Sequence, residues 1–219
     1  MRIPYWLTPH PTIPVTSWRS ENFWRAKPST ILILILGLWL FGTGEALLIK
    51  SGLGVSPWTV LAEGIAIQTR LTIGLATFLT SVIVLTFWIP LKERLGLGTV
   101  LNAIVIALAI DVMLQILPSN EILWINFSEV ILGVLLVGLG SSLYLTCNMG
   151  PGPRDGWMTG LHKKTKVSVG KVRLFIEISV LTIGWLLGGT VGIGTLIFAS
   201  LIGYSVAVWL NIVKNSQNS

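Results

Sequence analysis

The chain has 219 residues, of which 53% are hydrophobic and 11% are charged, and its mean hydropathy is +0.80. A soluble domain carries about 25% charged residues, so this composition excludes a soluble globular protein. The formal net charge is +6, but no module that combines basic and aromatic residues is present, and we expect no nucleic-acid partner.

Residues 1–30 precede the first apolar run and contain Trp6, Trp18 and Trp24 among prolines and scattered basic residues. The run that follows is too long for the core of a secretory signal and lacks a small-residue cleavage site. We interpret 1–30 as a cytoplasmic leader. It is either an interfacial segment whose indoles rest at the membrane surface or a disordered tail.

Six stretches of roughly 20 residues are long and apolar enough to cross the hydrocarbon as helices. They are 31–49, 71–89, 98–117, 128–147, 172–189 and 194–213. Lipid offers backbone groups no hydrogen-bond partners, and the alternating pattern of a membrane barrel is absent. The sequence therefore predicts an all-α integral membrane protein with six transmembrane helices, an external connection at 118–127 and a cytoplasmic tail at 214–219.

The basic residues predict the orientation of these spans. If both termini lie in the cytoplasm, only Lys50 and Arg70 are outside, and the other thirteen of the fifteen Lys and Arg residues are inside. Such a bias is the usual topology signal of membrane proteins. The inside set is Arg2, Arg19, Arg25, Lys27, Lys92, Arg94, Arg154, Lys163, Lys164, Lys166, Lys171, Arg173 and Lys214.

Glycine motifs recur along the chain. Gly-Leu-Gly-Val-Ser-Pro-Trp at 52–58 corresponds to Gly-Pro-Gly-Pro-Arg-Asp-Gly-Trp at 150–157, and Gly-Leu-Gly-Thr at 96–99 corresponds to Gly-Ile-Gly-Thr at 192–195. We interpret 31–117 and 128–213 as two copies of one unit. Three spans in each copy force the second copy to enter the membrane in the opposite sense, which is an architecture of many secondary transporters.

The segment after each glycine turn is too short for another crossing. Pro57 is suited to the first position of a helix, and an apolar stripe continues through 57–67. Each copy is therefore predicted to have a short re-entrant or interfacial half-helix, whose N-terminal N–H groups would form a natural anion site. The glycine-turn backbone comprises Gly52, Gly54, Gly150 and Gly152. A tight turn followed by a plain interfacial helix is the alternative.

Charged residues inside the predicted spans are candidates for binding substrate or carrying protons, because charge in hydrocarbon is costly. Glu45, Asp111 and Glu177 are three carboxylates of this kind. A purely structural hydrogen bond is the alternative for each. Arg154 and Asp155 adjoin the second glycine turn, where they could gate the inner mouth or form an ordinary solvated loop.

Arg173 lies one helical turn before Glu177, so an intrahelical ion pair is the simpler interpretation of that arginine. Stripes of small residues allow close helix contacts between the copies, or in a homodimer. These stripes contain Gly133, Gly138 and Ser141, and Gly184 with Gly188.

These motifs together resemble the YczE/YyaS/YitT-type group of small bacterial membrane proteins. The resemblance rests on the motifs at 52–58 and 150–155, on Arg-x-x-x-Glu at 173–177, and on Gly-Gly-Thr-Val-Gly-Ile-Gly-Thr at 188–195. It covers about 30–213 and implies a multi-span protein of the bacterial inner membrane, without a substrate.

We predict a small transporter or permease with its site between the two repeats and an unidentified small-molecule substrate. The alternative is a membrane accessory protein that supports assembly or secretion of another system. Enzyme signatures are missing, so we expect no catalytic residues. We also expect no cofactor and no metal, because Cys147 stands alone and neither His10 nor His162 shares ligand spacing with another candidate.

Overall fold

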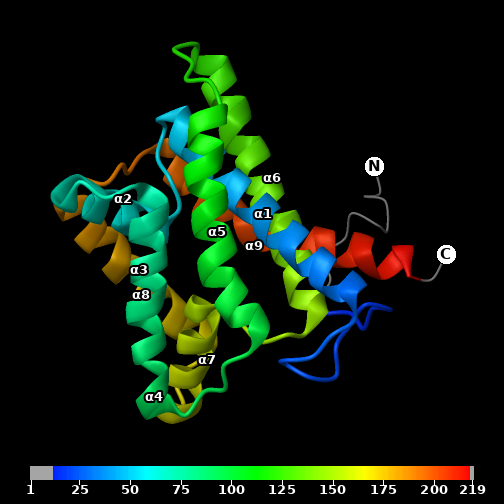
Figure 1. Ribbon diagram of the computed structural model, residues 1–219. Coiled ribbons are helices and arrows are strands. Elements are labelled where there is room, and N and C mark those ends of the chain that lie inside the picture. The colour runs from blue at the N-terminus through cyan, green and yellow to red at the C-terminus, as the bar shows by residue number, and fades with distance from the viewer. Residues whose placement is uncertain (1–11, 218–219) are drawn as a thin grey trace.

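The computed structural model describes residues 12–217, and all regular structure in that part of the chain is helical (Figure 1). The helices are α1 (Pro28–Ser51), α2 (Pro57–Thr69), α3 (Ile73–Thr86), α4 (Trp88–Leu91), α5 (Leu97–Ile116), α6 (Leu123–Cys147), α7 (Pro153–Thr165), α8 (Val169–Leu186) and α9 (Ile193–Ser216). Among the described residues, five segments are long and apolar enough to cross a membrane: α1, Ile73–Leu91, α5, α6 and α9.

Two of the predicted spans differ from the observed helices. The stretch 172–189 corresponds to α8, which is not among the five apolar segments because Lys171, Arg173 and Glu177 all lie within it. Its crossing of the membrane stays a prediction. The stretch 71–89 is interrupted at Phe87, between α3 and α4. Pro90 has no N–H to donate to the carbonyl four residues earlier, so the helix is interrupted there.

The two halves of the chain have the same order of helices. A long helix (α1 or α6) leads to a glycine turn, and a helix of 13 residues follows in both halves, starting at Pro57 in α2 and at Pro153 in α7. Gly54 and Gly150 precede these prolines with φ of 109° and 104°, a backbone conformation that favours glycine. The helices predicted after the glycine turns are therefore present at both positions.

Each glycine turn docks on the other half of the molecule. The Gly194 N–H donates to the Leu53 carbonyl at 2.7 Å, and the Gly98 N–H donates to the Met149 carbonyl at 2.8 Å. A Cβ on Gly54 or on Gly150 would lie 2.7 Å from the hydroxyl of Thr195 or Thr99, respectively. Each Gly-x-Gly-Thr motif is thus the surface on which the glycine turn of the opposite half docks. This contact accounts for the recurrence of the turn motif and of the Gly-x-Gly-Thr motif in both halves.

Helices α1 and α6 cross at close range because glycines face each other. A Cβ on Gly44 would lie 2.7 Å from the Gly133 carbonyl oxygen, and a Cβ on Gly133 would lie 2.8 Å from that of Gly44. Gly184 of α8 packs in the same way against Leu61 of α2, and Gly138 packs against Ser205 of α9. These members of the predicted small-residue stripes make contacts within one chain. The homodimer stays a prediction.

We expect the Gly44→Ala variant to be destabilised by about 1–3 kcal/mol, because backbone on α6 cannot move away from the added methyl group. The measurement is thermal unfolding in detergent. Gly203→Ala is the matched control, since nothing lies within 4 Å of a Cβ at Gly203 in α9. That control should be neutral or slightly stabilising. Equal transition temperatures for Gly44→Ala and Gly203→Ala would contradict this packing.

The described part of the leader lies against the ends of α5 and α6. Trp18 Nε1 donates to Thr146 Oγ1 at 3.1 Å, and the Ser20 N–H donates to the Cys147 carbonyl at 3.0 Å. The Leu97 N–H at the start of α5 donates to the Phe23 carbonyl at 2.9 Å. Residues 12–27 therefore close over the glycine turn of the second half, whereas Trp6 lies outside the described residues.

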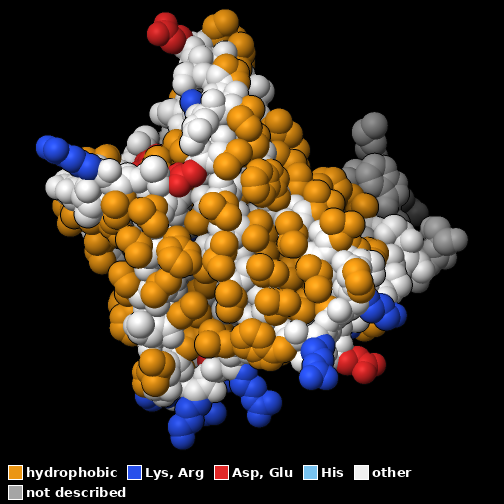
Figure 2. Space-filling model, in the orientation of Figure 1, with side chains coloured by type: hydrophobic (Ala, Val, Ile, Leu, Met, Phe, Trp, Pro, Cys, Tyr) orange, Lys and Arg blue, Asp and Glu red, His pale blue; other side chains and the backbone are white. Residues whose placement is uncertain are grey.

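Apolar side chains cover most of the face shown in Figure 2, over α3, α5 and α1. Lys and Arg side chains gather along its lower edge, near α4 and α7 in Figure 1. Exposed leucine, isoleucine and valine side chains on α3, α5, α6, α8 and α9 contribute to the apolar surface of the protein. An apolar surface with a charged rim at one end is suited to the hydrocarbon region of a membrane.

Candidate functional site

A cavity of about 200 Å³ lies between the two halves of the chain. Its wall takes side chains from α1, α2, α3, α5, α6, α7, α8 and α9. The first residues of α2 and of α7 both line it, so the N-terminal ends of the two short helices meet at the same space. The polar lining includes Glu45, Ser56, Asn102, Tyr144, Gly152, Arg154, Asp155, Arg173 and Glu177.

Glu45 of α1 is 1% exposed, and hydroxyl groups of α2 hold its carboxylate. Ser56 Oγ donates to the two carboxylate oxygens at 2.9 and 3.0 Å, and Thr59 Oγ1 donates to Oε2 at 2.8 Å. A buried carboxylate is tolerated when such hydrogen bonds replace water. Ser56 is also the N-cap residue of α2, but its side chain makes no cap hydrogen bond because the hydroxyl is directed to Glu45.

Arg154, in the first turn of α7, lies over the indole of Trp58 in the first turn of α2. Its guanidinium carbon is 4.9 Å from the ring centroid, a cation–π arrangement between the two halves. Arg154 also interacts electrostatically with Glu45, Asp155 and Glu177. Among the described residues, its guanidinium makes no hydrogen bond or ion pair. Trp58 is 5% exposed, and its buried Nε1 has no hydrogen-bond partner among the described residues.

Three further charged groups of the cavity have their own partners. The Tyr144 hydroxyl of α6 donates a short hydrogen bond to Asp155 Oδ2. Arg173 Nε lies 2.7 Å from Glu177 Oε1 within α8, where the two side chains are 49% and 24% exposed. The ion pair expected from the i, i+4 spacing is therefore formed. Both of its members also line the cavity.

Asp111 has a different position from the other predicted site residues. It is not part of the cavity wall, and its carboxylate caps the start of α3. Thr72 Oγ1 donates to Oδ2 at 2.6 Å, and the Gly74 N–H donates to Oδ1 at 2.8 Å. An acceptor at a helix N-terminus satisfies N–H groups that have no partner within the helix. The structure thus gives Asp111 a helix-capping position.

The four glycines of the predicted turn backbone fall into three positions. Gly52 ends α1 with φ of 64° and is exposed, while Gly54 and Gly150 dock on the opposite half. Gly152 is the N-cap of α7 and lines the cavity. A Cβ at Gly152 would lie 3.1 Å from Asp155 Oδ2. Only this glycine of the four therefore borders the space where a ligand would bind.

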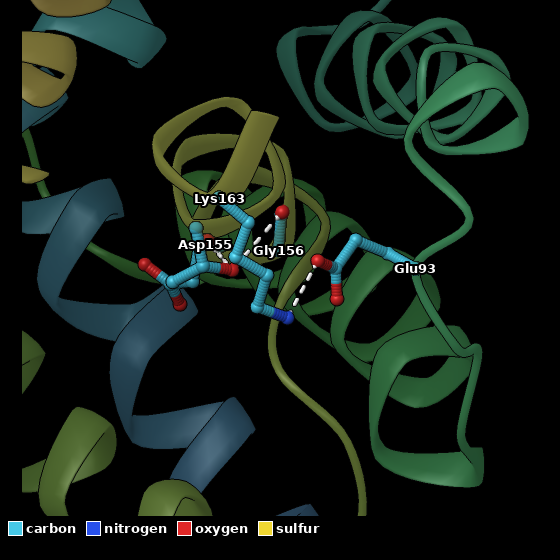
Figure 3. Close-up of polar contacts among 5 residues, drawn as sticks. Glu93, Asp155, Gly156 and Lys163 are labelled. Atoms are coloured by element: carbon cyan, nitrogen blue, oxygen red, sulfur yellow. Dashed lines mark hydrogen bonds and ion pairs between the residues drawn. The ribbon is translucent and has the colours of Figure 1, made fainter. Parts of the chain in front are cut away.

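Helix α7 is fixed beside α3 and α4 by aromatic and charged contacts. The Trp88 indole donates from Nε1 to the Pro153 carbonyl at 2.9 Å, and Trp157 stacks on Phe87 at 5.2 Å between centroids. Figure 3 shows Lys163 reaching from α7 to Glu93, with 2.7 Å between Nζ and Oε1. The Lys163 side chain is 66% exposed, so this pair contributes little stability. It joins the far end of α7 to the segment after α4.

Sequence reasoning did not select Trp58, Thr59 or Tyr144 as site residues. In an apolar span an aromatic residue is indistinguishable from a packing residue, and Thr59 meets Glu45 only through the turn between α1 and α2. The one available signal was the hydroxyl and indole at the start of a predicted half-helix. Within residues 12–217 no cluster of three or more His, Cys, Asp and Glu side chains could hold a metal ion.

Sequence comparisons place the chain among bacterial membrane proteins. A family of unknown function, DUF6198, matches residues 28–211. An uncharacterised protein of Haemophilus influenzae is 49% identical over 92% of each chain. The uncharacterised membrane protein YczE of Bacillus subtilis is 31% identical over 82% of this chain and 81% of its own, and YyaS of the same organism is 29% identical over 82% and 91%. No solved structure matches.

Proposed function

The chain belongs to the DUF6198 family of unknown function, and we propose that it is a small membrane transporter or permease whose site is the cavity between its two halves. The observation that carries the proposal is the meeting of the α2 and α7 N-termini at one cavity that also contains Glu45 and Arg154. Transporters with duplicated halves place substrate sites between the repeats, where short or broken helices present their N-termini.

The energetic cost of placing charged side chains within a membrane protein supports a functional site at the cavity. A charged side chain at the centre of a bilayer costs about 2.5–3.5 kcal/mol on insertion scales. The cavity wall has five charged side chains in a chain with 11% charged residues. A bundle that served only as a structural support would gain stability from apolar residues at these positions, because charged clusters stabilise a buried region poorly.

We further propose that the two halves are inverted repeats and that α8 is the sixth span. Three crossings per half would direct the C-terminal ends of α2 and α7 to opposite sides of the membrane, while their N-terminal ends meet at the cavity. Both termini would be in the cytoplasm of a bacterial cell, with the thirteen basic residues on that side.

The transport proposal is tested by reconstituting the protein into vesicles and measuring uptake of a panel of labelled anions, cations and neutral solutes. We expect saturable uptake of at least one class above that of protein-free vesicles. An accessory protein would move none of them. In that case truncation of the leader would abolish function in cells, and variants of Glu45 and Glu177 would be tolerated.

Topology gives an independent prediction. Gln68 and Lys164 are exposed near the C-terminal ends of α2 and α7, and each is the twelfth residue of its helix. We expect a membrane-impermeant thiol reagent to label Gln68→Cys in intact cells, and Lys164→Cys only after the inner face is opened. The parent chain is the control that should not label, because Cys147 is buried. Labelling of both variants from one face would contradict the inverted arrangement.

A further inference from the structure

We propose that the cavity binds a small organic anion, with its charged oxygen atoms at Arg154 and the N-terminal ends of α2 and α7 and its apolar part against the aromatic and aliphatic wall. This inference rests on the proposed function and names the substrate class of the same site. It follows from which groups of the cavity have partners and which do not.

The positive side of the site is Arg154. A guanidinium has five N–H donors, and those of Arg154 have no hydrogen-bond acceptor among the described residues, although the side chain lines the cavity. The Trp58 indole lies against the guanidinium, at 4.9 Å from its central carbon to the ring centroid. An oxyanion that binds the guanidinium in a bidentate manner would satisfy two of its donors.

The helix N-termini add donors of the same kind. Helices α2 and α7 have 13 residues each, and neither has a side-chain cap hydrogen bond. The Ser56 hydroxyl is directed to Glu45, and Gly152 has no side chain that could cap. The N–H groups of both first turns therefore lack side-chain acceptors at the cavity. Two helix dipoles directed with their positive ends at one space favour a negative ligand.

The carboxylates of the cavity do not reverse this preference, because each is already engaged. Glu45 accepts from the hydroxyl groups of Ser56 and Thr59, Asp155 accepts from Tyr144, and Glu177 is paired with Arg173. A cationic ligand would also meet the guanidinium groups of Arg154 and Arg173 on the same cavity wall, and both repel a positive charge. An anion needs only Arg154 and the helix ends, which are not engaged by side-chain acceptors.

The size and the apolar wall limit the rest of the ligand. Phe41, Ile106, Phe198 and Ile202 line the cavity beside the charged groups. The cavity volume of about 200 Å³ suits a small ligand. We therefore infer a ligand with a single oxyanion head and a short apolar body.

Ligand-dependent thermal unfolding of the purified protein tests the inference. The probes are propionate, benzoate, propanesulfonate, inorganic phosphate and propylammonium, over a concentration series. We expect a saturable rise in the unfolding temperature of several degrees with at least one organic anion and none with propylammonium. For Arg154→Gln, the apparent dissociation constant of that anion should rise about tenfold to a hundredfold.

Arg94→Gln is the matched control, because it removes the same charge from an exposed arginine outside the cavity wall. It should bind the anion as the parent chain does. Arg154→Lys keeps the positive charge without the guanidinium fork and serves as a second variant if Arg154→Gln does not fold. Its affinity should lie between those of the parent and Arg154→Gln.

The outcomes separate this inference from the proposed function. Stabilisation by propylammonium alone, by phosphate alone, or by no organic anion would overturn the organic-anion assignment. Equal loss of affinity in Arg94→Gln and Arg154→Gln would overturn the placement at Arg154. Uptake of cations or neutral solutes but of no anion would support the proposed transporter and contradict the organic-anion assignment. Arg154-dependent binding of an anion without uptake of any solute would support the assignment and contradict the transporter.

Discussion

The Glu45→Gln variant should fold normally and lose substrate uptake by at least about tenfold. Glutamine keeps an oxygen that can accept from Ser56 and Thr59, so the hydrogen bonds of the α1–α2 contact are largely retained. It removes the negative charge that interacts electrostatically with Arg154 in the cavity. Uptake into reconstituted vesicles and thermal unfolding are measured on the same preparation.

Glu63→Gln is the matched control for this prediction. Glu63 of α2 is also buried, at 7% exposure, but it accepts from the Thr190 N–H at 2.8 Å and does not line the cavity. Its uptake should equal that of the parent chain. Glu45→Ala should instead unfold at a lower temperature, because two buried hydroxyl groups lose their acceptor. Normal uptake by a stable Glu45→Gln protein would contradict a role of Glu45 in transport.

Glu177→Gln should likewise be stable and correctly inserted but unable to move substrate. The ion pair with Arg173 is partly exposed, so its loss alone should cost only about 0–1 kcal/mol. Glu177 also lines the cavity and interacts electrostatically with Arg154. We therefore expect the charge to matter for transport more than for folding.

The double variant Arg173→Gln/Glu177→Gln separates the two interpretations. If Glu177 only neutralises Arg173, the single Glu177→Gln change should destabilise the protein, and the double change should restore both stability and uptake. If Glu177 acts in the cavity, removing Arg173 as well should not restore uptake. Thermal unfolding and vesicle flux on both single variants and the double variant give the answer.

The repeat of glycine motifs predicted which segments form corresponding helices, because positive φ and close backbone approach both require glycine. It did not predict that each turn docks on the opposite half, since Gly54 and Gly192 are far apart in the chain. The break at Phe87 was readable from Pro90 but was outweighed by a continuous apolar run. The docking of the leader through Trp18 has no periodic signal.

For the candidate site as well, the sequence predicted individual residues, whereas contacts between distant segments were not predictable. The cost of charge in an apolar chain selected Glu45, Glu177 and Asp111 as candidates. Only the packing of helices separates them, because α3 begins beside Asp111 and takes its carboxylate as a cap. Composition alone could not reveal that Arg154 would meet Trp58, since that contact joins residues from opposite halves.

The most direct test of transport through this cavity is reversible blockage at Asn102, which lines the cavity from α5. Asn102→Cys in vesicles is treated with a charged thiosulfonate reagent, and uptake of the solute identified in the panel is measured before labelling, after labelling and after reduction. Lys164→Cys, exposed on α7 outside the cavity wall, is the labelled control. We predict that labelling of Asn102→Cys abolishes uptake, that reduction restores it, and that labelled Lys164→Cys transports normally. Full uptake by completely labelled Asn102→Cys would contradict a transport path through the cavity.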